Sequence, residues 1–175
     1  MSTTTFIRIP TQLLLKMKDD IARPHPFAYE RVGFLLCKPA QSANSLGMFA
    51  YDYCSIPDEE YIEDTTVGAM IGSDAMRRAL ILAFNHGKQD VSVFHIHEHF
   101  GNGMPWFSEI DLNESARFIP DFFNTAPKVP HGTLVMNEEH IAGQIWLNKT
   151  STPKTIDVIT SVGIPHKISM GYERA

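Results

Sequence analysis

A continuous apolar run, Val32–Cys37, constrains the fold most strongly, because an uninterrupted run of this length is typical of a buried strand. The hydrophobic patterns on either side predict further strands and helices. Strands are expected at 6–9, 48–56, 91–97, 131–137, 141–148, 154–161 and 166–170. Helices are expected at 11–21, from Ser73 to Gly87, and from Ser108 to a limit at Pro120, with a polar loop at 39–47. The sum predicts an α/β or α+β fold with roughly six to eight strands and three helices.

Length and charge narrow the range of functions. The 175 residues fit one domain spanning 1–175. The net charge of -5 provides no basic surface for phosphates, which argues against nucleic-acid binding. No apolar run is long enough to span a membrane and the N-terminus lacks the pattern of a signal peptide, so a cytoplasmic location is expected. The two cysteines, Cys37 and Cys54, are predicted to be free thiols in or near the core.

A pattern of metal-binding side chains lies between residues 95 and 111. His95 and His97 share one face of the predicted strand, because alternate residues of a strand point the same way. With Ser108 as the N-cap of the next helix, Asp111 falls in its first turn and can face the strand end. Three protein ligands and one open position are typical of a catalytic zinc ion. The alternative is that both histidines are simply satisfied by hydrogen bonds.

These residues resemble the JAMM motif of the JAB/MPN metalloprotease family. The family pattern is a glutamate on an upstream strand, then His-x-His, then Ser-x-x-Asp. Glu30, the pair His95 and His97, and Ser108 with Asp111 match it. The chain departs from the pattern in having Glu98 after the histidine pair, where proline is usual, and a loop to Ser108 that is longer than the common one. The variant is similar to prokaryotic JAB proteins that accompany ubiquitin-activation-like enzymes.

The resemblance implies a single JAB/MPN-like domain, α/β in class, with a central mixed sheet flanked by helices. It also implies roles for the site residues. His95, His97 and Asp111 would bind Zn²⁺, which lowers the pKa of water, and Glu30 would pass a proton from that water to the leaving amine. Ser108 would stabilise the oxyanion as well as cap its helix. His99 would contact the ligands or be an ordinary loop residue.

The function implied is a zinc-dependent isopeptidase or peptidase that removes a ubiquitin-like protein from conjugates or precursors. Its partners would be the C-terminal tail of that protein and E1-like or E2-like enzymes of the same operon, in some cases in antiphage defence. The alternatives are a peptidase that processes a sulfur-carrier protein, a catalytically silent MPN scaffold and a structural zinc domain. Two further expectations concern loops. Trp106 and Phe107 are predicted to pack on the core, and the acidic segment 58–64 is either solvated or attracts a basic tail.

Overall fold

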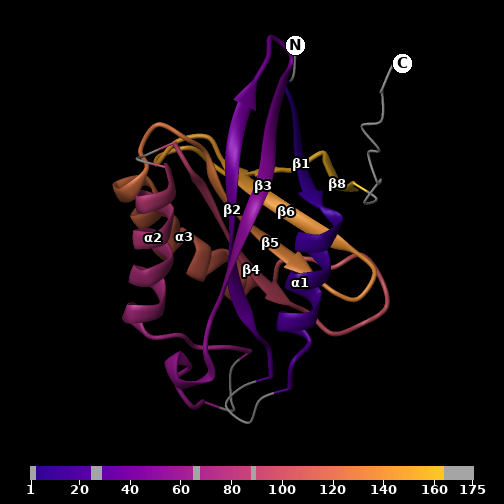
Figure 1. Ribbon diagram of the computed structural model, residues 1–175, viewed down its shortest axis with the longest axis vertical. Helices are drawn as coiled ribbons and strands as arrows, with labels where there is room; N and C mark the ends of the chain where they lie inside the picture. The colour runs from indigo at the N-terminus through magenta and orange to yellow at the C-terminus, as the bar shows by residue number, and fades with distance from the viewer. Residues whose placement is uncertain (1–2, 25–28, 65–67, 88–89, 164–175) are drawn as a thin grey trace, which may run out of the picture.

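The computed structural model describes residues 3–24, 29–64, 68–87 and 90–163. It has mixed α/β architecture with eight strands and three α-helices in these ranges (Figure 1). The strands are β1 (Thr4–Pro10), β2 (Val32–Gln41), β3 (Ser45–Ser55), β4 (Ser92–Glu98), β5 (His131–Met136), β6 (Ile141–Trp146), β7 (Lys154–Thr155) and β8 (Val158–Val162). The helices are α1 (Thr11–Ile21), α2 (Ser73–Gly87) and α3 (Glu109–Thr125), with a short 3-10 helix at Asp58–Glu60.

All eight strands belong to one mixed sheet, in the order β7-β6-β5-β4-β2-β3-β1-β8. The strand β4 lies in its middle, antiparallel to β2 and parallel to β5. Although β7 and β8 stand at opposite ends of this order, only Ile156 and Asp157 separate them in the chain. The N–H of Ile156 donates to Gly143 of β6, and the N–H of Asp157 donates to Thr5 of β1. The sheet must therefore curl until its two edges approach each other.

Helices cover both faces of this curled sheet (Figure 1). Met17 and Ile21 of α1 pack in one hydrophobic core with Leu35 and Phe94. A second core on the opposite face includes Phe34 and Leu36 of β2, Ala75 and Ala79 of α2, and Ile119 and Phe122 of α3. The alternation of Phe34, Leu35 and Leu36 between the two cores confirms that β2 is buried on both sides. On β4, the odd-numbered residues face α3, because His95 packs against Phe118 of that helix.

Three local predictions were wrong. Most of the predicted loop 39–47 is the hairpin of β2 and β3, in which Pro39 pairs with Met48. Proline is tolerated there because the pairing of β2 with β4 ends at Cys37, so the missing N–H of Pro39 faces no strand. Helix α3 continues through Pro120 to Thr125, and buried Phe122 and Phe123 pack its last turn. The strand predicted at 154–161 is split into β7 and β8.

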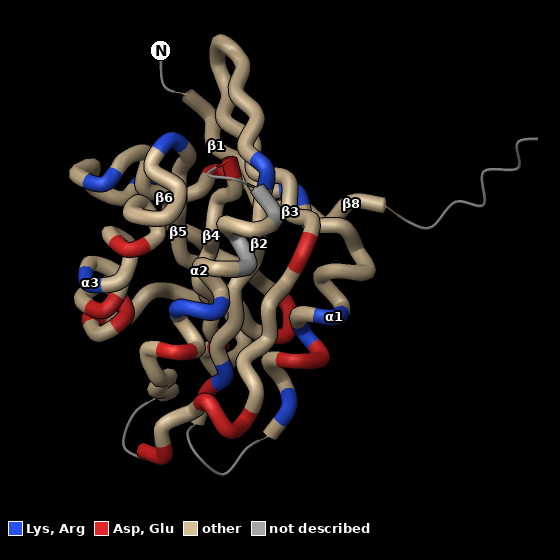
Figure 2. Tube along the Cα trace, turned by 60° about the vertical axis from the view of Figure 1, so that its left-hand side comes forward, with Lys and Arg blue, Asp and Glu red and all other residues tan. Residues whose placement is uncertain are grey.

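The remaining predicted strand, 166–170, lies outside the described residues. None of the described helices has the length and apolar character that crossing a membrane requires. Basic and acidic residues are interspersed along the chain traced in Figure 2.

Candidate metal centre

The carboxyl end of β4 brings histidines next to an acidic residue that lies just before the neighbouring strand β2. Val32 of β2 pairs with His97 of β4, so antiparallel register carried two residues further places Glu30 opposite His99. His99 follows the last residue of β4, and its N–H donates to the carbonyl of Met136 at 2.9 Å. The backbone therefore still follows β5 at this point, and His99 keeps the side-chain direction of His97.

The amino-terminal end of α3 supplies the carboxylate. Ser108 is its N-cap, and its Oγ accepts from the N–H of Asp111 at 3.2 Å. In return, Asp111 Oδ2 accepts from the N–H of Ser108 at 2.6 Å, which completes a capping box. The predicted capping role of Ser108 is confirmed, and the reciprocal bonds fix the carboxylate at the mouth of the site.

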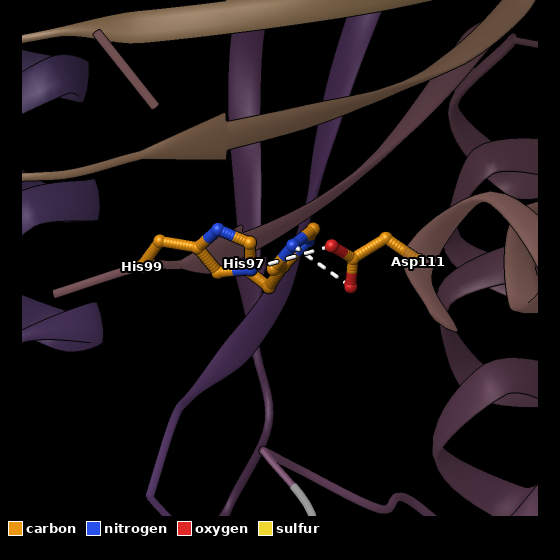
Figure 3. Close-up of side chains that lie close together, drawn as sticks. All are labelled: His97, His99 and Asp111. Carbon is orange, nitrogen blue, oxygen red and sulfur yellow. Dashed lines mark ion pairs between the residues drawn. The ribbon is translucent and has the colours of Figure 1, made fainter. Parts of the chain in front are cut away.

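His97, His99 and Asp111, hereafter the triad, form the group of described residues that could hold a metal ion (Figure 3). Nε2 of His97 lies 3.3 Å from Asp111 Oδ1, and Nε2 of His99 lies 3.3 Å from Asp111 Oδ2. Two ligand atoms that share a tetrahedral zinc ion are separated by about 3.3 Å, given metal–ligand distances near 2.05 Å. The separations in the triad are compatible with this value, and one ligand atom of each residue lies within 4.8 Å of the other two.

The polar groups of the triad also fit a cation. Both ring nitrogens of His97 are buried: Nε2 meets the carboxylate of Asp111 at 3.3 Å, and Nδ1 has no hydrogen-bond partner among the described residues. Leaving such groups unsatisfied is costly, and coordination would satisfy one of them. Burial lowers the pKa of His99, so its imidazole is neutral, which is the form that ligates a metal. Burial opposes ionisation of Asp111, but hydrogen bonding to His97 and Ser108 outweighs it and keeps the pKa of this carboxyl below its usual value.

His95, one of the expected ligands, does not belong to this group. Its ring centroid lies 4.9 Å from that of Phe118 on α3 and 5.6 Å from that of Phe34 on β2. Burial lowers the pKa of His95 to about 3, so the ring is neutral. The geometry thus brings His99, rather than His95, into the group of residues that could hold a metal ion. The signal was present in the sequence, because His97 and His99 form a second His-x-His pair that overlaps the first.

Glu30, the expected base, lies beside the triad, with Oε1 4.0 Å from Nε2 of His99. Burial raises the pKa of Glu30 to about 6, although nearby His97 opposes the shift. The segment before α2 is hydrogen-bonded to Glu30, since the N–H of Glu30 donates to the carbonyl of Gly68 at 2.7 Å. A Cβ at Gly68 would lie 2.5 Å from Glu30 Oε2 and would force the carboxylate to shift, a close contact that sequence reasoning missed.

Exposed large apolar side chains flank His99 and Asp111 in the sequence. They are Phe100, Met104, Trp106 and Ile110, hereafter the apolar rim, and they are 63–74% exposed. The predicted packing of Trp106 on the core was wrong, because this ring contacts the edge of His99 and is otherwise open to solvent. Phe107 is half-buried against His97. Exposed large apolar side chains commonly mark a binding site where they gather in one patch.

The acidic segment 58–64 is partly neutralised within the fold. Asp58 pairs with buried Arg31 at 2.8 Å, and Glu60 pairs with Arg78 at 2.6 Å. Glu59 and Glu63 are exposed. The segment therefore offers less free negative charge for attracting a basic tail than its sequence suggests.

Comparison with known proteins places the chain in no family. No family model matches it, and no curated protein matches it. Among solved structures it is similar to the STIL N-terminal domain of Trichoplax adhaerens, with a TM-score of 0.38 and 9% sequence identity. The match covers 81% of this chain and 41% of that one. A likeness at this level carries no conclusion about function.

Proposed function

We propose that the protein is a zinc-dependent peptidase or isopeptidase of the JAB/MPN type, acting on a polypeptide tail such as that of a ubiquitin-like protein. The observation that carries the proposal is the position of Glu30 beside the triad, with Oε1 4.0 Å from His99. The resemblance to the JAMM motif supports it. When His97 and His99 are taken as the histidine pair, the spacing to Ser108 comes two residues closer to the common motif.

The metal would be held by His97, His99 and Asp111, with His95 packed behind them. Zinc supplies Lewis-acid chemistry that makes water a nucleophile at neutral pH. Glu30 takes the proton from the attacking water and delivers it to the amine nitrogen as the C–N bond breaks. A carboxyl group whose pKa is raised to about 6 is suited to both steps, because it can exchange protons near neutral pH.

The hydroxyl group of Ser108 can take part in catalysis as well as cap α3. Its Oγ uses a lone pair to accept from the N–H of Asp111, which leaves its O–H to donate to the developing oxyanion. The helix dipole of α3 adds partial positive charge at the same place. Both effects favour the transition state of acyl transfer over the ground state.

The apolar rim supports a polypeptide substrate rather than a small polar one. Trp106 and Ile110 are 72% and 74% exposed at the mouth of the site, where an extended tail reaching the triad would cover them. E1-like and E2-like enzymes are the partners that the resemblance adds to this proposal.

The test compares two glutamate variants on a ubiquitin-like fusion substrate. Glu30→Gln removes the proton-transfer group without changing its size, and we expect cleavage to fall by about 10²- to 10⁴-fold while zinc content stays near one ion per chain. Glu109→Gln is the matched control, because Glu109 is exposed in the first turn of α3. Full cleavage by Glu30→Gln would contradict the mechanism, and a wild-type protein that binds no zinc would contradict the site.

A further inference from the structure

The side chain of Asn137 is buried between two segments that are distant in sequence. Asn137 is 7% exposed and is the first residue of the β5–β6 turn, residues 137–140. Its Oδ1 accepts from the N–H of Glu139 at 3.0 Å and from the N–H of His140 at 2.8 Å. Its Nδ2 donates to the carbonyl of Gly101 at 3.1 Å and to that of Gly103 at 2.7 Å. Both lone pairs and both donors of the amide are therefore used.

The segment that Asn137 holds is the β4–α3 loop, residues 99–108. It begins with the ligand His99, carries most of the apolar rim, and ends at the N-cap Ser108. Its tip is open to solvent, and Gly101 has a φ of 132°, a backbone conformation that favours glycine. Such a tip has little packing of its own, so two hydrogen bonds from one buried amide weigh heavily in its conformation.

We infer that Asn137 is a positioning residue for the metal centre, which clamps the β4–α3 loop to the β5–β6 turn and so holds His99 in line with His97 and Asp111. The inference rests on the proposed metal centre. Metal-binding proteins commonly fix their ligands through hydrogen-bonded neighbours, and removing such a neighbour typically weakens metal affinity 10- to 100-fold. Here the neighbour acts on the backbone that follows the ligand rather than on its ring.

The two halves of the Asn137 amide can be separated by one substitution. Asn137→Asp retains an oxygen that accepts from the N–H groups of Glu139 and His140, so the turn keeps its bonds. The second oxygen replaces Nδ2 and faces two carbonyl oxygens, so both bonds to the loop become repulsive contacts. The added negative charge would by itself attract a cation, so any loss of zinc affinity has to come from the released loop.

The experiment measures zinc affinity by competition with a chromophoric chelator, and the protection of backbone amides by hydrogen exchange. For Asn137→Asp we expect a zinc affinity lower by roughly 10- to 100-fold, faster exchange in the β4–α3 loop and unchanged exchange in the turn. The absorption spectrum of the cobalt(II) form should also change, because it reports the arrangement of the ligands. The matched control is Asn148→Asp, since Oδ1 of Asn148 accepts from Thr150 in another turn and the same charge is added.

A second variant covers the case in which Asn137→Asp does not fold. Asn137→Ser can still accept from the turn but is too short to reach both loop carbonyls, and the same loss of zinc affinity is expected. Wild-type zinc affinity together with a wild-type cobalt spectrum in a folded Asn137 variant would overturn the inference and leave the proposed function intact. A wild-type protein without zinc would overturn both.

Discussion

The proposed exchange of His95 for His99 as a metal ligand gives the sharpest test of the site. The two residues lie on the same side of the chain, four positions apart, so His95→Ala and His99→Ala make the same chemical change at neighbouring places. At free zinc 100-fold above the wild-type dissociation constant, bound metal stabilises the folded state by about 2.7 kcal/mol. Removing a ligand weakens binding by at least the roughly 100-fold that loss of an orienting neighbour can cause. The stabilisation of His99→Ala by the same zinc concentration then falls to RT ln 2, about 0.4 kcal/mol, or less.

For His95→Ala we expect the zinc-dependent gain to stay near 2.7 kcal/mol. The zinc-free protein should be less stable than the wild type, because the ring of His95 packs against Phe118 and Phe34. The assay is urea unfolding with and without buffered zinc, which separates the metal-dependent free energy from the packing loss. The reasoning is refuted if His95→Ala loses the gain from zinc and His99→Ala keeps it.

Two other predictions concern Gly68, which lies beside Glu30, and the buried His131. Gly68→Ala places a Cβ 2.5 Å from Glu30 Oε2 and displaces the carboxylate, so peptide cleavage should fall about 10²-fold at unchanged zinc content; wild-type turnover would show that the contact is irrelevant. His131 is buried between the N–H of Val93 and the carbonyl of Ala126, and burial lowers its pKa from 6.5 to about 4. Because the unfolded chain binds the proton first, stability is fully present above pH 6.5 and declines toward pH 4, by about 3 kcal/mol for the whole shift. Urea unfolding across this window should show a shallower decline in His131→Gln, and equal slopes would rule out the assignment.

Much of the fold could be predicted from the sequence because its strands and helices carry strong local patterns. The apolar run of β2 and the helical pattern of α1 gave their positions closely. The errors arose where tertiary contacts outweigh local preference. Pro39 is tolerated in a strand because its N–H faces no partner, and Pro120 lies within α3 because buried Phe122 and Phe123 hold the last turn. The curl of the sheet depends on the pairing of β7 with β6 and of β8 with β1. No local sequence pattern predicts these two pairings.

The candidate site, like the fold, could be predicted from the sequence only in part. Residue chemistry pointed to Glu30, His97 and Asp111, and the structure brings these three side chains together. The contributions of Gly68 and Asn137 could not be predicted, because each acts through a contact between segments far apart in the chain. Gly68 matters for the space that it leaves beside Glu30, and Asn137 for four hydrogen bonds that no sequence spacing announces.

The choice between the two overlapping His-x-His pairs is decided by what lies above each histidine. All three rings point to one side of the chain, so the period of two is satisfied by either pair. The ring of His95 packs against Phe118, one of the residues with which α3 covers the sheet. Over His97 and His99 the first turn of α3 presents Asp111 instead, and Glu30, two residues before β2, lies across the register. A ligand set at the strand end can meet both a carboxylate and an approaching peptide, whereas His95 lies beneath an aromatic ring. Register and helix placement together therefore favour the second pair.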